Sequence, residues 1–212
     1  MFKLLVDNKE IEAEEGSNLL QCCLENDIYI PNLCHVEGLE SPPASCRLCF
    51  VEIEGIQRPV TSCTQKVKSG MVVKTDTSTV RKLQRSALRL ILSTHNVECS
   101  TCPSNKKCPL QRIAVLLKVS LKPKNLQHYI KQEAAGEQHP VLKYIPGRCV
   151  LCGKCIHACL RAQGKPFLAF AGRGLNTVIS FYGENEVADL PCLECLECVK
   201  ICPVSALVSK NG

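Results

Sequence analysis

Short runs in which apolar and polar residues alternate predict a small β-sheet near the start of the chain. Strands are expected in four such runs, at residues 2–6, 10–14, 50–54 and 71–75. The polar residues 7–9 separate the first two runs and suit a hairpin turn. A short helix is expected after Gly16, with Ser17 or Asn18 as its N-cap, and it should extend to about Asn26.

Farther along the chain, the apolar spacing becomes that of amphipathic helices. A helix over residues 78–94 would place five apolar side chains on one stripe, Val80, Leu83, Ala87, Leu90 and Ile91. Residues 114–119 should continue a later helix, and the polar residues 121–137 are expected to form a bridging helix and a linker. Residues 177–181 have the composition of a further strand.

The 17 cysteines of this 212-residue chain are bunched, many of them three residues apart. Such spacing is poor geometry for disulfides and good geometry for metal ligands. Two runs share the pattern C-x2-C-x2-C-x3-C, one from Cys149 to Cys159 and one from Cys192 to Cys202, and Pro203 follows the second. This is the spacing by which bacterial ferredoxins bind a pair of [4Fe–4S] clusters.

The last cysteine of each run is expected to serve the cluster of the other run. Three thiolates at intervals of three fit in one loop around a cubic cluster, whereas a helix that starts after the third carries the fourth away. We therefore predict two crossed ligand sets: Cys149, Cys152 and Cys155 with Cys202, and Cys192, Cys195 and Cys198 with Cys159.

The first third of the chain has a different pattern, C-x11-C-x2-C-x13-C, formed by Cys34, Cys46, Cys49 and Cys63. A sheet, a helix and a cysteine-rich loop ahead of a C-x2-C pair resemble the [2Fe–2S] ferredoxin β-grasp, although the first spacing is not the plant-type one. Four zinc-binding or structural cysteines are the alternative, but zinc prefers two tight pairs.

The segments Pro31-Asn-Leu-Cys34 and Cys46-Arg-Leu-Cys49 are similar to the N-terminal module of the complex I 75 kDa subunit. This resemblance implies a [2Fe–2S] cluster on the four cysteines. Ala44 stands where that family usually has glycine, and the loop is about one residue longer. These two departures concern the path of the loop more than the cluster.

Three more cysteines follow the long predicted helix, in the pattern H-x3-C-x2-C-x5-C. By itself the pattern also fits a zinc site with one histidine and three cysteine ligands. With Leu110-Gln111 after it, it is similar to the His-ligated [4Fe–4S] segment of the same 75 kDa subunit and of iron-only hydrogenases. The resemblance implies a third [4Fe–4S] cluster, held by His95, Cys99, Cys102 and Cys108. A neutral imidazole in place of a thiolate should raise its reduction potential.

Several other residues are expected to have ordinary roles. Cys22 and Cys23 face different directions on a helix and should be small buried side chains. Two histidines outside the ligand sets, His128 and His139, are expected to be solvated. His157 is expected to be solvated or to lie beside a cluster. Gly172 and Gly174 are expected to let the backbone approach a cluster.

The predicted fold class is α+β, in three modules. They are a β-grasp [2Fe–2S] ferredoxin at residues 1–77, a small helical domain for the His-ligated [4Fe–4S] cluster with a linker at 78–140, and a two-cluster bacterial-ferredoxin domain at 141–212. The order of these blocks over residues 1–208 resembles the small diaphorase subunit of NAD-reducing hydrogenases. It also resembles the N-terminal iron–sulfur half of bifurcating-hydrogenase large subunits.

This resemblance implies an iron–sulfur relay subunit of an NAD(P)-linked oxidoreductase. Its partners would be a flavin-bearing NAD(P)H-binding diaphorase subunit and a catalytic oxidoreductase subunit, with a hydrogenase favoured. The alternatives are the same relay in a formate dehydrogenase, transhydrogenase or NADH:quinone-type complex, an autonomous ferredoxin, and a zinc-binding scaffold. No nucleotide site or catalytic site is expected in this chain, since it has neither a P-loop nor a G-x-G-x-x-G motif after a strand.

Charge and composition argue against other classes of partner. The formal net charge of +6 counts every thiol as neutral, and ligand thiolates with inorganic sulfide would bring the loaded protein to about −1. Tryptophan is absent, so few side chains can stack on bases, and nucleic-acid binding is not expected. The apolar start is too short for a signal-peptide core, and no membrane insertion is expected. A reducing cytoplasm is the expected setting.

Overall fold

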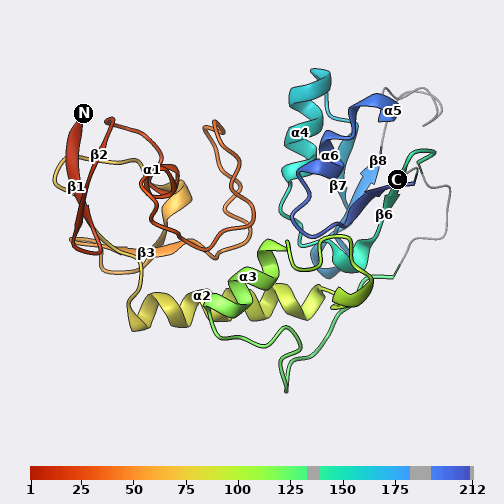
Figure 1. The fold of residues 1–212 in the computed structure, drawn as a ribbon, viewed down its shortest axis with the longest axis horizontal. Coiled ribbons are helices and arrows are strands. Elements are labelled where there is room, and N and C mark those ends of the chain that lie inside the picture. Colours follow the sequence, from red (N-terminus) through yellow and green to blue (C-terminus); the bar gives the residue numbers. More distant parts are fainter. Residues whose placement is uncertain (133–138, 182–191, 211–212) are drawn as a thin grey trace. The chain divides into compact units, whose positions relative to one another are not determined.

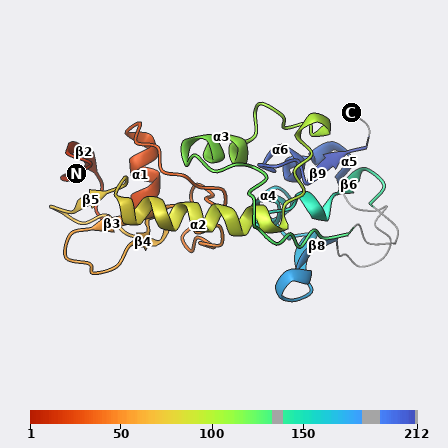
Figure 2. The same ribbon diagram turned by 90° about the horizontal axis from the view of Figure 1, so that it is seen from below.

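The computed structural model describes residues 1–132, 139–181 and 192–210 (Figure 1). The chain divides into two compact units, one made of Met1–Arg89 with Leu116–Val119 and the other of Leu90–Val115 with Ser120–Gly212. Helix α2, Ser78–Thr94, contributes to both and is one uninterrupted helix, as predicted (Figure 2). The three-module division at residues 77 and 140 stays a prediction.

The first unit contains a five-stranded sheet in the order β2-β1-β5-β3-β4. Its strands are β1 Phe2–Val6, β2 Lys9–Ala13, β3 Phe50–Ile53, β4 Val60–Thr61 and β5 Val72–Lys74. Strands β1 and β5 are parallel and the other neighbours are antiparallel, so the chain crosses over between the first hairpin and β5. The four predicted strands are confirmed; β4 was missed because two residues are too few to show an alternation.

A tight turn joins β1 to β2 and also anchors the far end of the sheet. Asp7 and Asn8 both have positive φ, 48° and 67°, as a two-residue hairpin turn with the right-handed strand twist requires. The Asp7 carboxylate accepts hydrogen bonds from the Thr75 backbone N–H, at 2.8 Å, and from the Thr75 hydroxyl. The turn therefore holds the end of β5 beside β1.

Helix α1, Leu19–Glu25, packs its apolar residues into the core of this unit. The Asn18 side chain caps it by accepting a hydrogen bond from the Gln21 N–H at 3.1 Å. Cys22 and Cys23 are 4% and 0% exposed, which confirms the prediction that they are buried core residues. Burial raises the pKa of Cys23 to about 12, so this thiol stays protonated.

The second unit contains short elements. Its helices are α3 Pro109–Leu116, α4 Lys154–Gln163, α5 Cys192–Cys195 and α6 Glu197–Lys200, and its strands are β6 Leu142–Tyr144, β7 Leu168–Ala171, β8 Val178–Phe181 and β9 Leu207–Ser209. The 3₁₀ turns of the chain are η1 Ser62–Thr64, η2 Cys99–Thr101, η3 Pro146–Arg148 and η4 Gly174–Asn176. Strand β6 pairs antiparallel with β9, and β7 with β8. Among the described residues, no helix combines the length and apolar character that a membrane crossing needs.

The predicted extent of helix after residue 109 was wrong. Helix α3 ends at Leu116 instead of continuing to residue 119, and Lys118 has a positive φ of 53°. Residues 121–132 contain no helix, so the predicted bridging helix is wrong there; residues 133–137 lie outside the described part of the chain. Pro123 lacks the N–H that a helix needs, and Asn125 has a φ of 59°, which explains the open conformation.

Gly172 serves a tight turn and not the approach to a cluster that the sequence suggested. Its φ is +78°, and a Cβ atom there would lie 2.5 Å from the carbonyl oxygen of Asn176. The contact is within the connection from β7 to β8. A side chain at this position would therefore disrupt the hairpin.

The prediction that His139 is solvated was also wrong. Its side chain is 2% exposed, and its Nδ1 accepts hydrogen bonds from the N–H groups of Val141 and Leu142, both at 3.2 Å. Its ring lies 5.0 Å from that of Phe181. This environment depends on residues distant in sequence, so no local pattern indicates it. His128 is exposed as predicted, and His157 is half-buried.

The buried His139 predicts a loss of stability in mild acid. Burial, helped by the charge of Lys210, lowers its pKa, so the native state favours the neutral ring that accepts the two N–H groups. Its contribution to stability is therefore present above the unfolded pKa of about 6.5 and is lost as the pH falls below it. We expect the unfolding midpoint to depend less on pH between 7 and 5 in His139→Gln than in the wild type. His128→Gln is the matched control, and an unchanged pH dependence in His139→Gln would contradict the expectation.

Candidate metal centres

The structure brings the four cysteines of the first predicted set together in the first unit. Their exposures are 2%, 5%, 1% and 1% for Cys34, Cys46, Cys49 and Cys63. The Sγ atoms of Cys34 and Cys46 are 3.4 Å apart, and Cys63 interacts electrostatically with the other three. Cys63 lies in η1, whose Ser62 donates to the Cys49 carbonyl oxygen from both its N–H and its hydroxyl.

The four thiols form two hydrogen-bonded pairs, and in each pair the pKa of one thiol is lowered while the pKa of its partner is raised. The hydrogen bond from Cys46 lowers the pKa of Cys34, and the one from Cys63 lowers the pKa of Cys49 to about 7. Thiolates are the form that binds iron. Four buried thiols in one place, two of them poised to lose a proton, suit a shared metal group.

The loop before Cys46 follows the path that glycine would favour, even though alanine is present. Ala44 has a φ of 47° and Arg47 a φ of 53°, both in the left-handed region. This conformation costs a non-glycine residue about 1–2 kcal/mol. The departure at Ala44 therefore adds strain to the loop. The Arg47 guanidinium stacks over the Phe50 ring at 5.0 Å.

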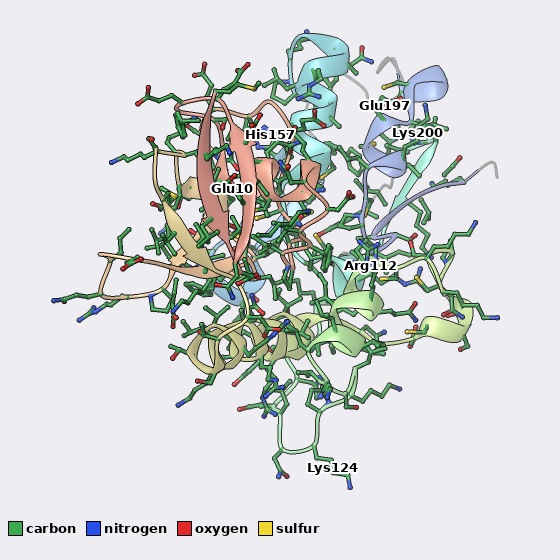
Figure 3. All side chains as sticks on the ribbon, turned by 60° about the vertical axis from the view of Figure 1, so that its left-hand side comes forward. Glu10, Arg112, Lys124, His157, Glu197 and Lys200 are labelled. Atoms are coloured by element: carbon green, nitrogen blue, oxygen red, sulfur yellow. The ribbon has the colours of Figure 1, made fainter. Side chains whose placement is uncertain are left out.

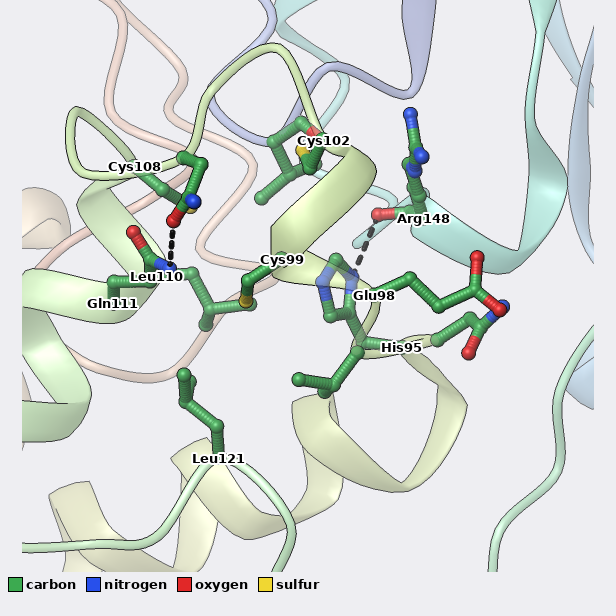
Figure 4. A pocket seen from close by; sticks show the side chains of 13 residues that line it. His95, Glu98, Cys99, Cys102, Cys108, Leu110, Gln111, Leu121 and Arg148 are labelled. Carbon is green, nitrogen blue, oxygen red and sulfur yellow. Dashed lines mark hydrogen bonds between the residues drawn. The ribbon is translucent and has the colours of Figure 1, made fainter.

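The second set lines one pocket of about 370 Å³ in the second unit (Figure 4). The four predicted ligands, His95, Cys99, Cys102 and Cys108, all contribute to its wall. His95 directly follows helix α2, Cys99 begins η2, and Cys108 directly precedes α3. Pro109 suits the first position of α3, because that position has no use for an N–H donor.

The orientation of His95 suits a metal ligand. Its Nδ1 lies 2.9 Å from the carbonyl oxygen of Arg148, which can only accept, so Nδ1 carries the proton (Figure 4). The Nε2 lone pair is then available to a metal, in the arrangement usual for ligand histidines. Burial lowers the pKa of His95, which favours the neutral ring. The residues present therefore fit a His-ligated cluster.

Gln111 organises the loop between Cys102 and Cys108. Its Oε1 accepts from the Lys106 N–H at 2.9 Å, and its Nε2 donates to Asn105 at 3.1 Å. Lys106 has a positive φ of 67°, so the amide holds the sharpest part of the loop. In the sequence, Gln111 is only part of a motif. Its hydrogen bonds to Lys106 and Asn105 show that it fixes the conformation of the loop between Cys102 and Cys108.

For the last two predicted sets, the structure places cysteines of the two runs near one another, and the crossed ligation itself stays a prediction. Cys202 interacts electrostatically with Cys149, Cys152 and Cys155, the first three cysteines of the other run. The remaining set, Cys159, Cys192, Cys195 and Cys198, lines a second pocket of about 360 Å³. Helix α4 carries Cys155 and Cys159 one turn apart, and α4 packs against α6 (Figure 1). One helix turn therefore separates the two sites.

Backbone N–H groups point at several of these sulfurs. Cys149 accepts from Leu151 at 3.4 Å, Cys159 from Phe167 at 3.2 Å, and Cys202 from Ala206 at 3.2 Å. Leu151 and Leu196 have left-handed φ of 52° and 50°, strained values that turn the backbone around the cysteine runs. Such donors stabilise the negative charge of cluster sulfurs.

The His95 set lies beside the ligands of the Cys202 set. The Cys102 and Cys108 sulfurs lie 4.0 and 3.7 Å from the carbonyl oxygens of Val204 and Pro203, which follow Cys202. On the other side, the carbonyl oxygen bound by His95 belongs to Arg148, which precedes Cys149.

In the described part of the chain, no three His, Cys, Asp or Glu side chains are grouped closely enough to hold a single metal ion.

Three family descriptions match successive parts of the chain. Residues 1–78 match a 2Fe-2S iron-sulfur cluster binding domain, residues 84–121 the NADH-ubiquinone oxidoreductase-G iron-sulfur binding region, and residues 148–207 a 4Fe-4S dicluster domain. The predicted α+β fold class, with its [2Fe–2S] and [4Fe–4S] ferredoxin-type modules, is confirmed by these matches and by the observed elements.

Two curated relatives and one solved structure extend this comparison. The G subunit of the NADH-quinone oxidoreductase of Rickettsia typhi is 34% identical over 99% of this chain and 30% of its own length. The HndD subunit of the NADP-reducing hydrogenase of Solidesulfovibrio fructosivorans is 33% identical over 98% and 36%. This chain thus spans about a third of each relative.

The crystal structure of an NAD⁺-reducing [NiFe]-hydrogenase in the H2-reduced state contains a chain with the same fold, at a TM-score of 0.86 and 29% identity. The match covers all of this chain and 88% of that one. The chain is therefore an iron–sulfur protein homologous to the G subunit of NADH-quinone oxidoreductase and to the HndD subunit of an NADP-reducing hydrogenase.

Proposed function

We propose that this chain is the electron-transfer subunit of a multi-subunit NAD(P)-linked oxidoreductase, with one [2Fe–2S] and three [4Fe–4S] clusters. One observation carries the proposal: fifteen cysteines and His95 form four sets of four, and the members of each set lie together. When bound, such clusters supply one-electron redox centres. The protein holds them at fixed spacing and excludes water from them.

The residues themselves support a relay within the second unit. Contacts from the His95 set reach Arg148, Pro203 and Val204, which adjoin ligands of the Cys202 set. That set adjoins the Cys159 set through helix α4. Three sites joined by such short protein paths suit sequential electron transfer. A protein that only stored one electron would need one cluster site and not three.

We further propose two partners: a flavin-bearing NAD(P)H-binding diaphorase subunit and a catalytic subunit, with a hydrogenase favoured. The support is the names of two similar proteins, an NADP-reducing hydrogenase subunit and an NAD⁺-reducing [NiFe]-hydrogenase. A flavin is the expected converter between hydride and one-electron centres. The second candidate is an NADH:quinone-type complex, favoured by the similarity to the NADH-quinone oxidoreductase relative. The cytoplasm is the proposed location, because unpaired clustered cysteines suit a reducing compartment.

Metal analysis tests the proposed cluster content. We expect about 14 iron atoms and as many sulfides per chain, the total for one two-iron and three four-iron clusters. His95→Ala should lower the iron content by about four, because the imidazole ligand would be lost from one four-iron site only. His128→Ala, at an exposed histidine outside every set, is the matched control. A colourless, zinc-loaded protein after anaerobic purification would contradict the proposal.

A further inference from the structure

A lysine whose ammonium nitrogen is buried and has no hydrogen-bond partner lies near the Cys149 set. The Nζ of Lys131 is shielded from solvent, and it has no hydrogen-bond partner among the described residues. An ammonium group in such a place is costly unless an opposite charge faces it. Burial lowers the pKa of Lys131, and the negative form of the Cys149 thiol opposes this effect by favouring the charged lysine.

The backbone brings Lys131 to this position by a close approach. A Cβ atom on Gly147 would lie 3.3 Å from the Lys131 carbonyl oxygen, a tight contact that shows how closely the two segments pass. Tyr129, two residues earlier, donates its N–H to the Ser93 carbonyl oxygen at 2.7 Å. Both contacts hold the lysine segment beside the turn that leads into Cys149.

Tyr144 approaches the same sulfur from strand β6. Its hydroxyl oxygen accepts a hydrogen bond from the Ile179 N–H at 3.1 Å, which leaves its own proton free to donate. The side chain that it then bonds is Cys149, and the phenol also interacts with Cys155 of the same set. The backbone N–H of Leu151 is a third donor to the Cys149 sulfur.

We propose that Lys131 and Tyr144 are positioning residues that set the reduction potential of the cluster on Cys149, Cys152, Cys155 and Cys202. Reduction adds a negative charge to the cluster. A buried ammonium and a hydroxyl donor stabilise that charge more than the charge of the oxidised form. Both groups therefore raise the reduction potential of this cluster. With them, the cluster accepts an electron more readily than it would without them. The inference rests on the ligand set proposed above.

The test is a redox titration of the cluster-loaded chain, followed by EPR, with Cys152→Ser used to assign the signal. Lys131→Met and Tyr144→Phe should each raise the oxidised-to-reduced ratio of this cluster, by about tenfold for Lys131→Met at fixed ambient potential. For a one-electron centre, tenfold corresponds to a potential lower by about 59 mV. Lys131→Arg keeps the charge and should restore most of the wild-type ratio.

Lys124→Met is the matched control, since it removes the same charge from a lysine that projects into solvent from the tip of its loop (Figure 3). The signal assigned with Cys195→Ser is an internal reference and should move less. Unchanged titrations in both Lys131→Met and Tyr144→Phe would overturn the inference while leaving the ligand set intact. If Lys131→Met does not fold, Tyr144→Phe alone decides, because it removes one hydroxyl only. A wild-type protein without this cluster signal would overturn the ligand set, and the inference with it.

Discussion

Replacement of Cys202 by serine is expected to perturb the cluster on Cys149, Cys152 and Cys155, and to leave the cluster nearer to it in sequence largely intact. The physical reason is the folded position of Cys202, whose charge acts on those three thiols although two of them lie in another loop and one in another helix. A serine alkoxide is a harder and poorer ligand for iron, so the cluster should be weakened and most of its native signal lost.

The measurement is EPR of the reduced protein, with the two signals assigned from separate Cys152→Ser and Cys195→Ser variants. Cys202→Ser should resemble Cys152→Ser. Cys22→Ser removes a buried thiol that belongs to no set and controls for non-specific damage. A Cys202→Ser spectrum that matches Cys195→Ser would show that the ligands are not crossed.

The second large effect concerns dependence on a partner. The separated chain, loaded with clusters, should be bleached by dithionite but should not be reduced by NADH or NADPH. Hydride transfer needs a nicotinamide held against a two-electron acceptor, and the sequence has no nucleotide-binding motif that would hold one. Addition of a flavin-bearing diaphorase subunit should make bleaching by NAD(P)H rapid.

Anaerobic absorbance spectroscopy follows this reaction directly. The same diaphorase without this chain measures background dye reduction, and the His95→Ala variant tests whether the whole relay is needed. Rapid bleaching of the isolated, flavin-free chain by NADH would reveal a nucleotide site. The protein would then be an enzyme in its own right.

The sequence indicates which cysteines the fold brings near one another, because cluster ligands are mostly local; that they bind clusters stays a proposal. A loop that wraps a cluster needs thiolates at fixed short intervals, and these intervals are visible as the spacing of cysteines in the sequence. The extent of helix α2 was equally readable, but its predicted apolar stripe was only partly right. Leu90 is 70% exposed, and the buried face includes Val80, Gln84, Ala87, Leu88 and Leu92. The predicted crossing of the two runs rests on the helix that carries Cys159 away from Cys155.

Features that depend on distant residues could not be predicted. Strands β6 and β9 have three residues each, and their pairing joins segments more than sixty residues apart. The burial of His139 depends on Phe181, and the role of Lys131 on its approach to Gly147. A single histidine or lysine in a polar stretch carries no periodic signal, so its environment appears only after the chain has folded.

The proposed crossed ligation would also have a consequence for how the protein is made. The sets closed by Cys63 and Cys108 are complete early in synthesis, so their clusters are open to insertion while the ribosome is still extending the chain. The set that begins at Cys149 lacks its fourth ligand until Cys202 has emerged, and by then the other run is complete as well. On the proposed ligand sets, neither of these two clusters could be completed until most of the second run has been synthesised. An uncrossed result for Cys202→Ser would remove this order, since the Cys149 set could then be loaded on its own.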